Sequence, residues 1–239
     1  MNYAPAIDAW PPRSSRRLLS ALSVPVALKR FHKTYRDRAF AFLDVGCGYH
    51  SPRRTKRYFP RCEYYGIDRD IVELDSTDME AMETFYQIDL DRESLDTVPV
   101  NFFDVVVMSH VIEHLRNGLR VLDALATKLK PGGHIYLEFP SAASLATPRG
   151  QRGCLHFSDD ATHVRLYSVP EVVNVLLNRD FEIIAAGRRR DPIRLLLTPI
   201  ALLAGLARGD IWGGGRRLWD FVGFADFVYA RRKDGRLAC

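Results

Sequence analysis

Small and acidic residues follow one another closely in the first third of the chain. Asp44 is followed by Gly46 and Gly48, and Asp68 comes about twenty residues further on, after a second apolar segment. Glycines let a backbone approach a ligand closely, and an acid after the second strand can accept hydrogen bonds from ribose hydroxyls. A tight turn beside a surface acid would have the same local sequence, but Asp89 closes a third apolar segment in the same manner. The pattern therefore predicts a cofactor that carries a nucleoside.

The loop after Gly48 narrows the choice of cofactor. Dinucleotide-binding folds place a third glycine where the pyrophosphate meets the N-terminus of a helix. Here residues 49–53 read YHSPR and contain no glycine. Asp44 also places a negative charge beside the loop, which repels a pyrophosphate and attracts a cationic or amino-bearing ligand. A nicotinamide-dependent oxidoreductase is thus disfavoured.

The residues named so far require a sheet that brings them together. Strands are expected in seven apolar segments, at 41–45, 62–67, 84–88, 103–108, 134–139, 181–186 and 224–230. Amphipathic helices are expected over 111–130, ended by PGG at 131–133, and from the capping box at Ser168 to about Asn178. Strands that alternate with helices imply a parallel sheet covered on both faces, with the acids gathered at the carboxyl ends of its strands.

Several of these segments resemble, in the right order, the motifs of class I S-adenosylmethionine-dependent methyltransferases. The similar segments are FLDVGCG at 42–48, YGID at 65–68, DL at 89–90, FDVVVMSHVIEHL at 103–115 and LKPGGH at 129–134. The resemblance covers about residues 40–186 and again 223–232. It implies an α/β fold with a Rossmann-like, seven-stranded, mostly parallel sheet, helices on both faces and a terminal antiparallel β-hairpin. It also implies S-adenosylmethionine as the cofactor.

The same resemblance implies a set of cofactor-binding residues. Gly46 and Gly48 would pass close to the methionine part of the cofactor, and Asp68 would hold the ribose hydroxyls. Asp44 would face the amino group, Asp89 and Leu90 would frame the adenine, and Ser109 and His110 would lie beneath the sulfonium. The complete set is Asp44, Gly46, Cys47, Gly48, Asp68, Asp89, Leu90, Ser109 and His110. The chain departs from the family pattern at His50, where many members carry another glycine.

Histidines are the candidates for catalysis. Methyl transfer from a sulfonium mainly requires alignment of the acceptor and exclusion of water. A hydroxyl acceptor also needs a base with a pKa near neutrality, which points to histidine. We expect His163 or His114 to be the base, oriented by Asp160 or Glu113, although each histidine could instead have a purely structural role. The segment DATHVRLY at 160–167 resembles one found in many methyltransferases of this group, and the expected substrate-binding residues are His156, Asp160 and Arg165.

The stretch before His163 also contains potential metal ligands, namely Cys154, His156 and Asp159. The spacing of these residues matches no common zinc pattern, and loops of this polarity are common without a metal. The sequence therefore predicts no metal site.

The chain is interpreted as one domain with additions. Residues 1–40 are expected to form an N-terminal helical extension, with helical spacing over 18–38. Residues 41–239 are expected to form the methyltransferase domain, with an inserted helical segment at about 187–222. The insertion contains three arginines at 188–190 and an apolar stretch at 195–207, which suits a lid, a helix packed on the sheet edge or a peripheral membrane contact through 188–207. The apolar stretch is too short to cross a bilayer, and the start of the chain has no apolar core of the signal-peptide type. We therefore expect a cytoplasmic protein. It would be peripheral at the membrane if the insertion makes that contact.

Charge is distributed unevenly along the chain. The 239 residues include 34 lysines and arginines and 29 aspartates and glutamates, a formal charge of +5, and 47% are apolar, which excludes disorder as the main state. The net charge is +6 over residues 1–40, −6 over 41–180 and +5 over 181–239. The part that resembles the cofactor-binding core is therefore acidic, which suits a cationic cofactor and makes nucleic acid an unexpected partner.

The expected reaction is methylation of an oxygen on a small molecule, a sugar or a lipid-linked glycan. Methylation of base amino groups is disfavoured, because the turn after the fourth strand reads SHVI at 109–112 rather than N/D-P-P-Y/F. A methyltransferase that acts on another macromolecule stays an alternative. So does a scaffold protein that binds the cofactor without catalysis.

Overall fold

A computed structural model describes residues 24–48, 50–149, 155–207 and 218–235 of the chain. Three parts of the sequence analysis lie outside the described residues. They are residues 1–23 of the predicted extension, Cys154, and residues 208–217 of the predicted insertion. The strands form one seven-stranded sheet in the order β3-β2-β1-β4-β5-β7-β6. Their bounds are β1 Phe40–Val45, β2 Cys62–Asp68, β3 Thr84–Gln87, β4 Phe103–Ser109, β5 Leu129–Pro140, β6 Phe181–Arg188 and β7 Ala225–Arg232.

The sheet confirms the predicted fold class. Strands β1 to β5 pair in parallel, and β7 pairs antiparallel with both β5 and β6. The strand order reverses between β1 and β4, since β2 and β3 extend the sheet on one side of β1 and β4 and β5 on the other. In sheets of this kind ligands bind at the carboxyl ends of the strands beside such a reversal. The Rossmann-like arrangement therefore brings the ends of β1, β2 and β4 to one edge.

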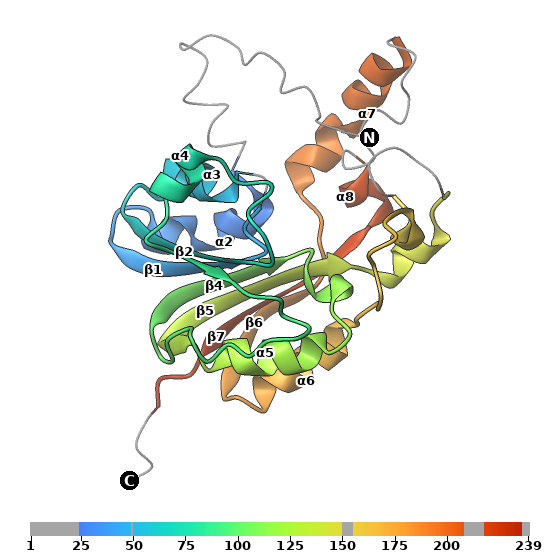
Figure 1. Ribbon diagram of the computed structural model, residues 1–239. Coiled ribbons are helices and arrows are strands. Elements are labelled where there is room, and N and C mark those ends of the chain that lie inside the picture. Colours follow the sequence, from blue (N-terminus) through green and yellow to red (C-terminus); the bar gives the residue numbers. More distant parts are fainter. Residues whose placement is uncertain (1–23, 49, 150–154, 208–217, 236–239) are drawn as a thin grey trace.

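Helices cover both faces of the sheet (Figure 1). On one side lie α2 (Val26–Tyr35), α3 (Ser51–Tyr58) and α4 (Ser76–Glu80), and on the other lie α5 (Gly118–Ala126) and α6 (Val169–Leu177). The two sides have separate hydrophobic cores because side chains alternate along a strand. In β1, Phe42 belongs to the core beneath α2, whereas Leu43 and Val45 belong to the core above α5 and α6.

The helix predicted over 111–130 is divided into two parts. A 3₁₀ turn over Ile112–His114 is followed by extended backbone at Leu115, and α5 begins only at Gly118. The hydroxyl of Tyr167 explains the break, because it donates to the Leu115 carbonyl oxygen at 2.7 Å and accepts the Gly118 N–H at 3.0 Å. A Cβ at Gly118 would lie 2.7 Å from this hydroxyl. The predicted glycine break at 131–133 instead lies inside β5, where Gly132 has a φ of 77°.

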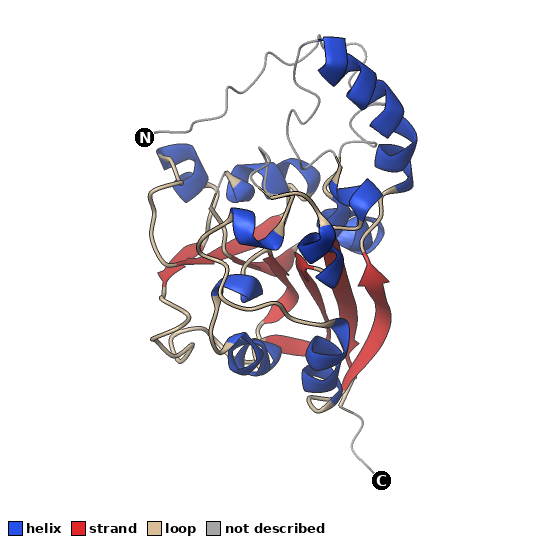
Figure 2. Ribbon diagram, turned by 90° about the vertical axis from the view of Figure 1, so that its right-hand side faces the viewer, coloured by secondary structure: helices blue, strands red, loops and turns tan. Residues whose placement is uncertain are grey.

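The helix before the first strand is packed against the rest of the protein, whereas the helix between the last two strands extends away from it. Helix α2 lies within the predicted helical stretch and packs tightly, because Leu28, Phe31 and Tyr35 are all buried. In the region of the predicted insertion, α7 (Pro192–Ala207) extends away from the sheet and is followed by the short helix α8 (Trp219–Val222), as Figures 1 and 2 show. Among the described residues, no helix is both long and apolar enough to cross a membrane.

Candidate functional site

The loop after β1 is fixed by two glycines. Gly46 has a φ of 77°, which side chains disfavour, and a Cβ there would lie 2.3 Å from Cγ2 of Val111. The Gly48 N–H donates to Oδ2 of Asp68 at 3.1 Å. The loop is thereby held against the end of β2, with its backbone beside the acid that the sequence predicts for a ribose.

Asp44 lies beneath this loop at the end of β1. Its Oδ2 accepts hydrogen bonds from the hydroxyls of Ser51 and Tyr64, both at 2.6 Å. Burial raises the pKa of Asp44 to about 6, although these two hydrogen bonds oppose the shift. The side chain therefore orders the loop and supplies negative charge close to it.

Asp68 retains hydrogen-bonding capacity for a ligand. Its oxygens accept backbone hydrogen bonds from Gly48 and from Arg69 at 2.8 Å, and the Asp70 backbone also acts on this carboxylate, while a carboxylate offers about four acceptor sites. Burial raises the pKa of Asp68 above its usual range, while the hydrogen bonds from the backbone groups lower it. The remaining lone pairs fit a pair of ribose hydroxyls.

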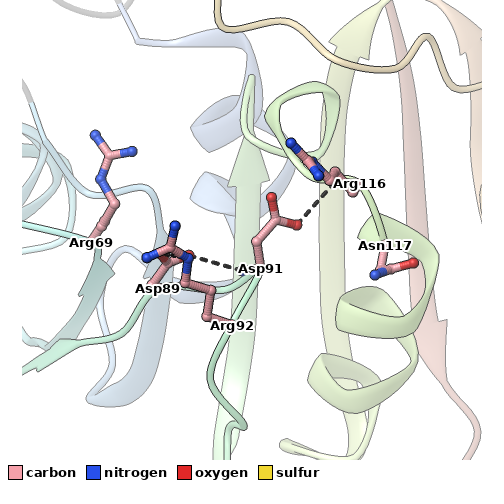
Figure 3. A pocket seen from close by; sticks show the side chains of 6 residues that line it. All are labelled: Arg69, Asp89, Asp91, Arg92, Arg116 and Asn117. Atoms are coloured by element: carbon pink, nitrogen blue, oxygen red, sulfur yellow. Dashed lines mark hydrogen bonds and ion pairs between the residues drawn. The ribbon is translucent and has the colours of Figure 1, made fainter.

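A pocket of about 320 Å³ opens at the carboxyl ends of β2, β3 and β4 (Figure 3). It is lined by Arg69, Asp89, Asp91, Arg92, Arg116 and Asn117. Asp89, which the resemblance assigns to the adenine, is one of these lining residues. Its neighbour Leu90 is partly buried and packs against the hydrophobic core. The side chain of Cys47 is fully buried, and a Cβ at Gly66 would lie 2.6 Å from its Sγ.

Together these features fit S-adenosylmethionine. The carboxylates at the ends of β1, β2 and β3 lie in the order that would suit the amino group, the ribose and the adenine edge of this cofactor. Asp44 and Asp68 place negative charge beside the glycine loop, which suits the positive charge of the sulfonium and of the amino group. The pocket that contains Asp89 is instead lined by three arginines and two aspartates.

Ser109 and His110 occupy the end of β4. His110 has a φ of 55°, and its ring lies between two carboxylates: Nδ1 is 3.1 Å from Oε1 of Glu113 and Nε2 is 3.1 Å from Oε1 of Glu138. Burial alone would lower the pKa of His110, but the hydrogen bonds to Glu113 and Glu138 raise it to about 9. Near neutral pH both ring nitrogens therefore carry protons and donate, which fixes the ring beside the cofactor loop.

Several residues of this network are absent from the sequence-based candidates. Nε of Arg189 lies 3.2 Å from Oε1 of Glu138, and its Nη2 lies 3.4 Å from Oδ2 of Asp220, which in turn lies 3.7 Å from Nη1 of Arg194. The segment after β6 is thus tied to His110 by buried charges. The sequence did contain one sign of Glu138, because a glutamate within the apolar run IYLEFP indicates a charged side chain in a buried strand.

The predicted catalytic histidines lie side by side. The ring centroids of His114 and His163 are 4.8 Å apart. Nε2 of His163 lies 3.9 Å from Oε1 of Glu113 and 3.9 Å from Oδ2 of Asp160. Both residues proposed to orient the base therefore lie next to the His163 ring.

The other two predicted substrate-binding residues have structural partners. Nδ1 of His156 accepts the N–H of Ser158 and caps a short 3₁₀ turn, and this side chain is buried. Arg165 donates to Glu171 at 2.7 Å and stacks over the ring of Tyr167. Neither side chain shares a partner with His114 or His163 among the described interactions.

Known proteins similar to this chain give a consistent result. A methyltransferase domain family model matches residues 17–186. A ubiquinone biosynthesis O-methyltransferase from Ralstonia nicotianae is 28% identical over 134 residues, which are 53% of this chain and 54% of that protein. The chain thus spans about half the length of this curated relative.

Two solved structures show the same fold. An S-adenosylmethionine-dependent methyltransferase from Mesorhizobium loti has a TM-score of 0.59 at 17% identity, over 86% of this chain and 98% of that one. An S-adenosylmethionine-dependent methyltransferase from Archaeoglobus fulgidus has a TM-score of 0.53 at 18% identity, over 91% of this chain and 94% of that one. With the motif order, the sheet and the family match in agreement, the chain belongs to the methyltransferase domain family and has the fold of these S-adenosylmethionine-dependent methyltransferases.

Proposed function

We propose that the chain transfers the methyl group of S-adenosylmethionine to a hydroxyl oxygen of a small molecule. The observation that carries this proposal is the pair His114 and His163, with ring centroids 4.8 Å apart, on segments that follow the carboxyl ends of β4 and β5. A hydroxyl must lose its proton as its oxygen attacks the methyl carbon, and a neutral imidazole accepts a proton near neutral pH. Sulfur keeps the electron pair of the broken bond, and S-adenosylhomocysteine leaves.

The curated relative supports an oxygen acceptor. Its name describes an O-methyltransferase of ubiquinone biosynthesis. Within this proposal the acceptor class extends to sugars and lipid-linked glycans. In the proposed roles, Asp44, Asp68 and Asp89 hold the cofactor, His163 or His114 takes the proton, and Asp160 binds the acceptor or orients His163.

We further propose a peripheral membrane contact through α7. Four apolar side chains of this helix are largely exposed, with exposed fractions of 77% for Leu196, 50% for Leu197, 64% for Ile200 and 66% for Leu203. Arg190 and Arg194 lie near the start of the helix, and α7 contains no acidic residue. An apolar surface flanked by cations suits the interface of an anionic membrane.

Cofactor binding and acceptor chemistry are tested separately. Calorimetry with S-adenosylhomocysteine should show binding, and Asp68→Ala should weaken it by about 1.5–3 kcal/mol, because the ribose loses a charged acceptor. Glu63→Gln, at the exposed start of the same strand, is the control with the same change in charge. Stabilisation by NAD alone would contradict the cofactor assignment.

The acceptor is found with methyl-labelled S-adenosylmethionine incubated with soluble and membrane extracts of the host. We expect the label on an oxygen of a small molecule or lipid, and loss of transfer in His163→Ala with cofactor affinity retained. Label on nitrogen or on a macromolecule would refute the proposed reaction. Binding of the cofactor without any transfer would support the non-catalytic alternative.

A further inference from the structure

We propose that Glu113, His114 and His163 form a binding site for one divalent transition-metal ion. One ligand atom from each of the three side chains lies within 4.8 Å of the other two. The residues come from two segments, the 3₁₀ turn after β4 and the loop before α6, which fold against each other. Two imidazoles and a carboxylate are a donor set that binds such ions.

The tautomer of His163 leaves its second nitrogen free for a metal. Nδ1 lies 2.7 Å from the carbonyl oxygen of Phe157, which can only accept, so Nδ1 carries the proton. In the neutral imidazole, Nε2 then presents a lone pair. It faces Oε1 of Glu113 and Oδ2 of Asp160, each 3.9 Å away, and neither carboxylate oxygen can donate to it. Three acceptors that face one another are stabilised by a cation between them.

His114 is oriented in the same way through Thr162. The Thr162 hydroxyl donates its hydrogen to Oδ1 of Asp160 at 2.6 Å. It must therefore accept at its contact of 2.8 Å with Nδ1 of His114, so this nitrogen carries the proton as well. A metal-ligating histidine commonly has its other N–H fixed by a hydrogen-bond acceptor in this manner.

Glu113 supplies a buried carboxylate with a free oxygen. The residue is fully buried, Oε1 receives the hydrogen bond from His110, and Oε2 has no hydrogen-bond partner among the described residues. A buried, charged oxygen without a partner is costly. The main chain of Glu113 also accepts the N–H groups of Val164 and Arg165, at 2.9 and 3.2 Å. The turn and the loop that hold the three ligands are thereby fixed to each other.

A second cluster of similar composition provides a contrast. His50, Asp75 and Asp78 also lie close together. There, however, Nη1 of Arg53 lies 3.1 Å from Asp75, its Nε lies 3.6 Å from Asp78, and Nδ1 of His50 lies 2.6 Å from Oδ2 of Asp78. Because a carboxylate oxygen accepts, Nδ1 of His50 carries the proton in this contact and presents no lone pair to an ion between these side chains, and Arg53 adds a positive charge beside them. This cluster is therefore the weaker candidate for a metal ion.

The site would act on the acceptor of the proposed reaction, and this role rests on the proposed function. A bound divalent ion lowers the pKa of a coordinated hydroxyl, so the acceptor oxygen loses its proton to water before transfer. That oxygen then forms the new bond to the methyl carbon, the carbon–sulfur bond breaks, and sulfur retains the electron pair. With the metal bound, His114 and His163 promote loss of the same proton as ligands, whereas without it one of them accepts the proton directly.

Cobalt provides a direct test, because Co²⁺ bound by nitrogen and oxygen ligands absorbs visible light. The full chain, treated with a chelator and freed of it, is titrated with Co²⁺ without an acceptor, and Zn²⁺ is then added as a competitor. We expect one Co²⁺ per chain, displaced by Zn²⁺. His163→Gln and His114→Gln should each weaken binding by about 100-fold or more, and Thr162→Val, which only frees His114, by about 10- to 100-fold.

His50→Gln is the matched control and should leave the affinity for Co²⁺ unchanged. If His50→Gln lost Co²⁺ binding while His163→Gln retained it, the metal would belong to the other cluster and the proposal would be overturned. Absence of Co²⁺ binding by the wild type would overturn it as well. Affinity for S-adenosylhomocysteine shows that the variants are folded. Methylation of oxygen at full rate without bound metal would refute the role of the metal in the reaction but not the reaction itself. Metal binding with label on nitrogen would refute the proposed reaction but not the metal site.

Discussion

Asp44 accepts hydrogen bonds from Ser51 and Tyr64 beneath the glycine loop, and its burial raises its pKa to about 6 from an ordinary value of 3.8. The folded chain therefore holds this proton more tightly than the unfolded chain does. Between these two pKa values the folded state binds more protons, so the free energy of unfolding falls as the pH rises through this window. Above it, the charge is present and costs stability, while it serves to attract a cationic ligand.

Asp44→Asn should separate these two effects. The amide keeps an oxygen for the two hydroxyls and removes the charge. We expect the variant to exceed the wild type in free energy of unfolding by about 2–3 kcal/mol near pH 7, and to lose the fall in stability between about pH 4 and pH 7. Urea titrations at both pH values measure this. Asp44→Ala, which leaves both hydroxyls without their acceptor, should be less stable than the wild type, and both variants should bind S-adenosylhomocysteine more weakly. Equal stability of the Asp44→Asn variant and the wild type would disprove the argument.

Among the elements, α2 packs on the sheet and contributes to the free energy of unfolding of the whole domain. Phe31 is fully buried and contacts the rings of Tyr136 and Tyr229 edge-on, with centroids 6.5 and 5.5 Å away. Truncation of a large core side chain removes buried apolar area and leaves a cavity. Phe31→Ala should therefore lower the free energy of unfolding by about 3–5 kcal/mol in denaturant titrations. The exposed neighbour provides the control, and Lys33→Ala should change it by less than about 0.5 kcal/mol. A dispensable extension would show equal, small effects for both.

The elements also show which features the sequence could predict. The strands followed from short apolar runs, and the acids at their ends followed from residue type and order, as with Asp68 and Asp89. The break before α5 depends on the Tyr167 hydroxyl, 49 positions away from Gly118, and no local pattern contains such a contact. The ion pairs of Arg189 with Glu138 and Asp220 likewise join distant segments. The proximity of His114 and His163 could not be predicted from the sequence either, because the spacing of residues along the chain does not determine which loops contact each other.

At the scale of the whole molecule, charge and apolar surface coincide at one end of the chain. The segment 181–239 has a net charge of +5 and includes the exposed leucines of α7. Of the three arginines at 188–190, Arg188 is paired with Asp226 and Arg189 is buried, so reversing all three charges would disturb the fold as well as the surface. Substitution of exposed leucines is therefore the cleaner test of membrane contact.

The double variant Leu196→Gln, Leu203→Gln should bind vesicles containing anionic phospholipid more weakly than the wild type in a sedimentation assay. Leu177→Gln on α6 is the control, since Leu177 is also 50% exposed but lies on another helix. Raising the salt from about 0.1 M to about 1 M shortens the screening length from about 10 Å to about 3 Å, and should weaken binding of the wild type. Equal binding by the wild type and the double variant would remove α7 from the contact.

The position of β7 has a consequence for synthesis on the ribosome. β7 lies between β5 and β6 in the sheet but follows both in the chain, and α7 lies between β6 and β7 in sequence. Until β7 emerges, β5 has an open edge and β6 has no partner. At about 5–20 residues per second, translation of the roughly 40 residues from β6 to β7 takes about 2–8 s. During this interval the nascent chain presents unpaired strand edges, which readily pair with other chains. The unfinished sheet is therefore most in need of a chaperone just before its last strand is made.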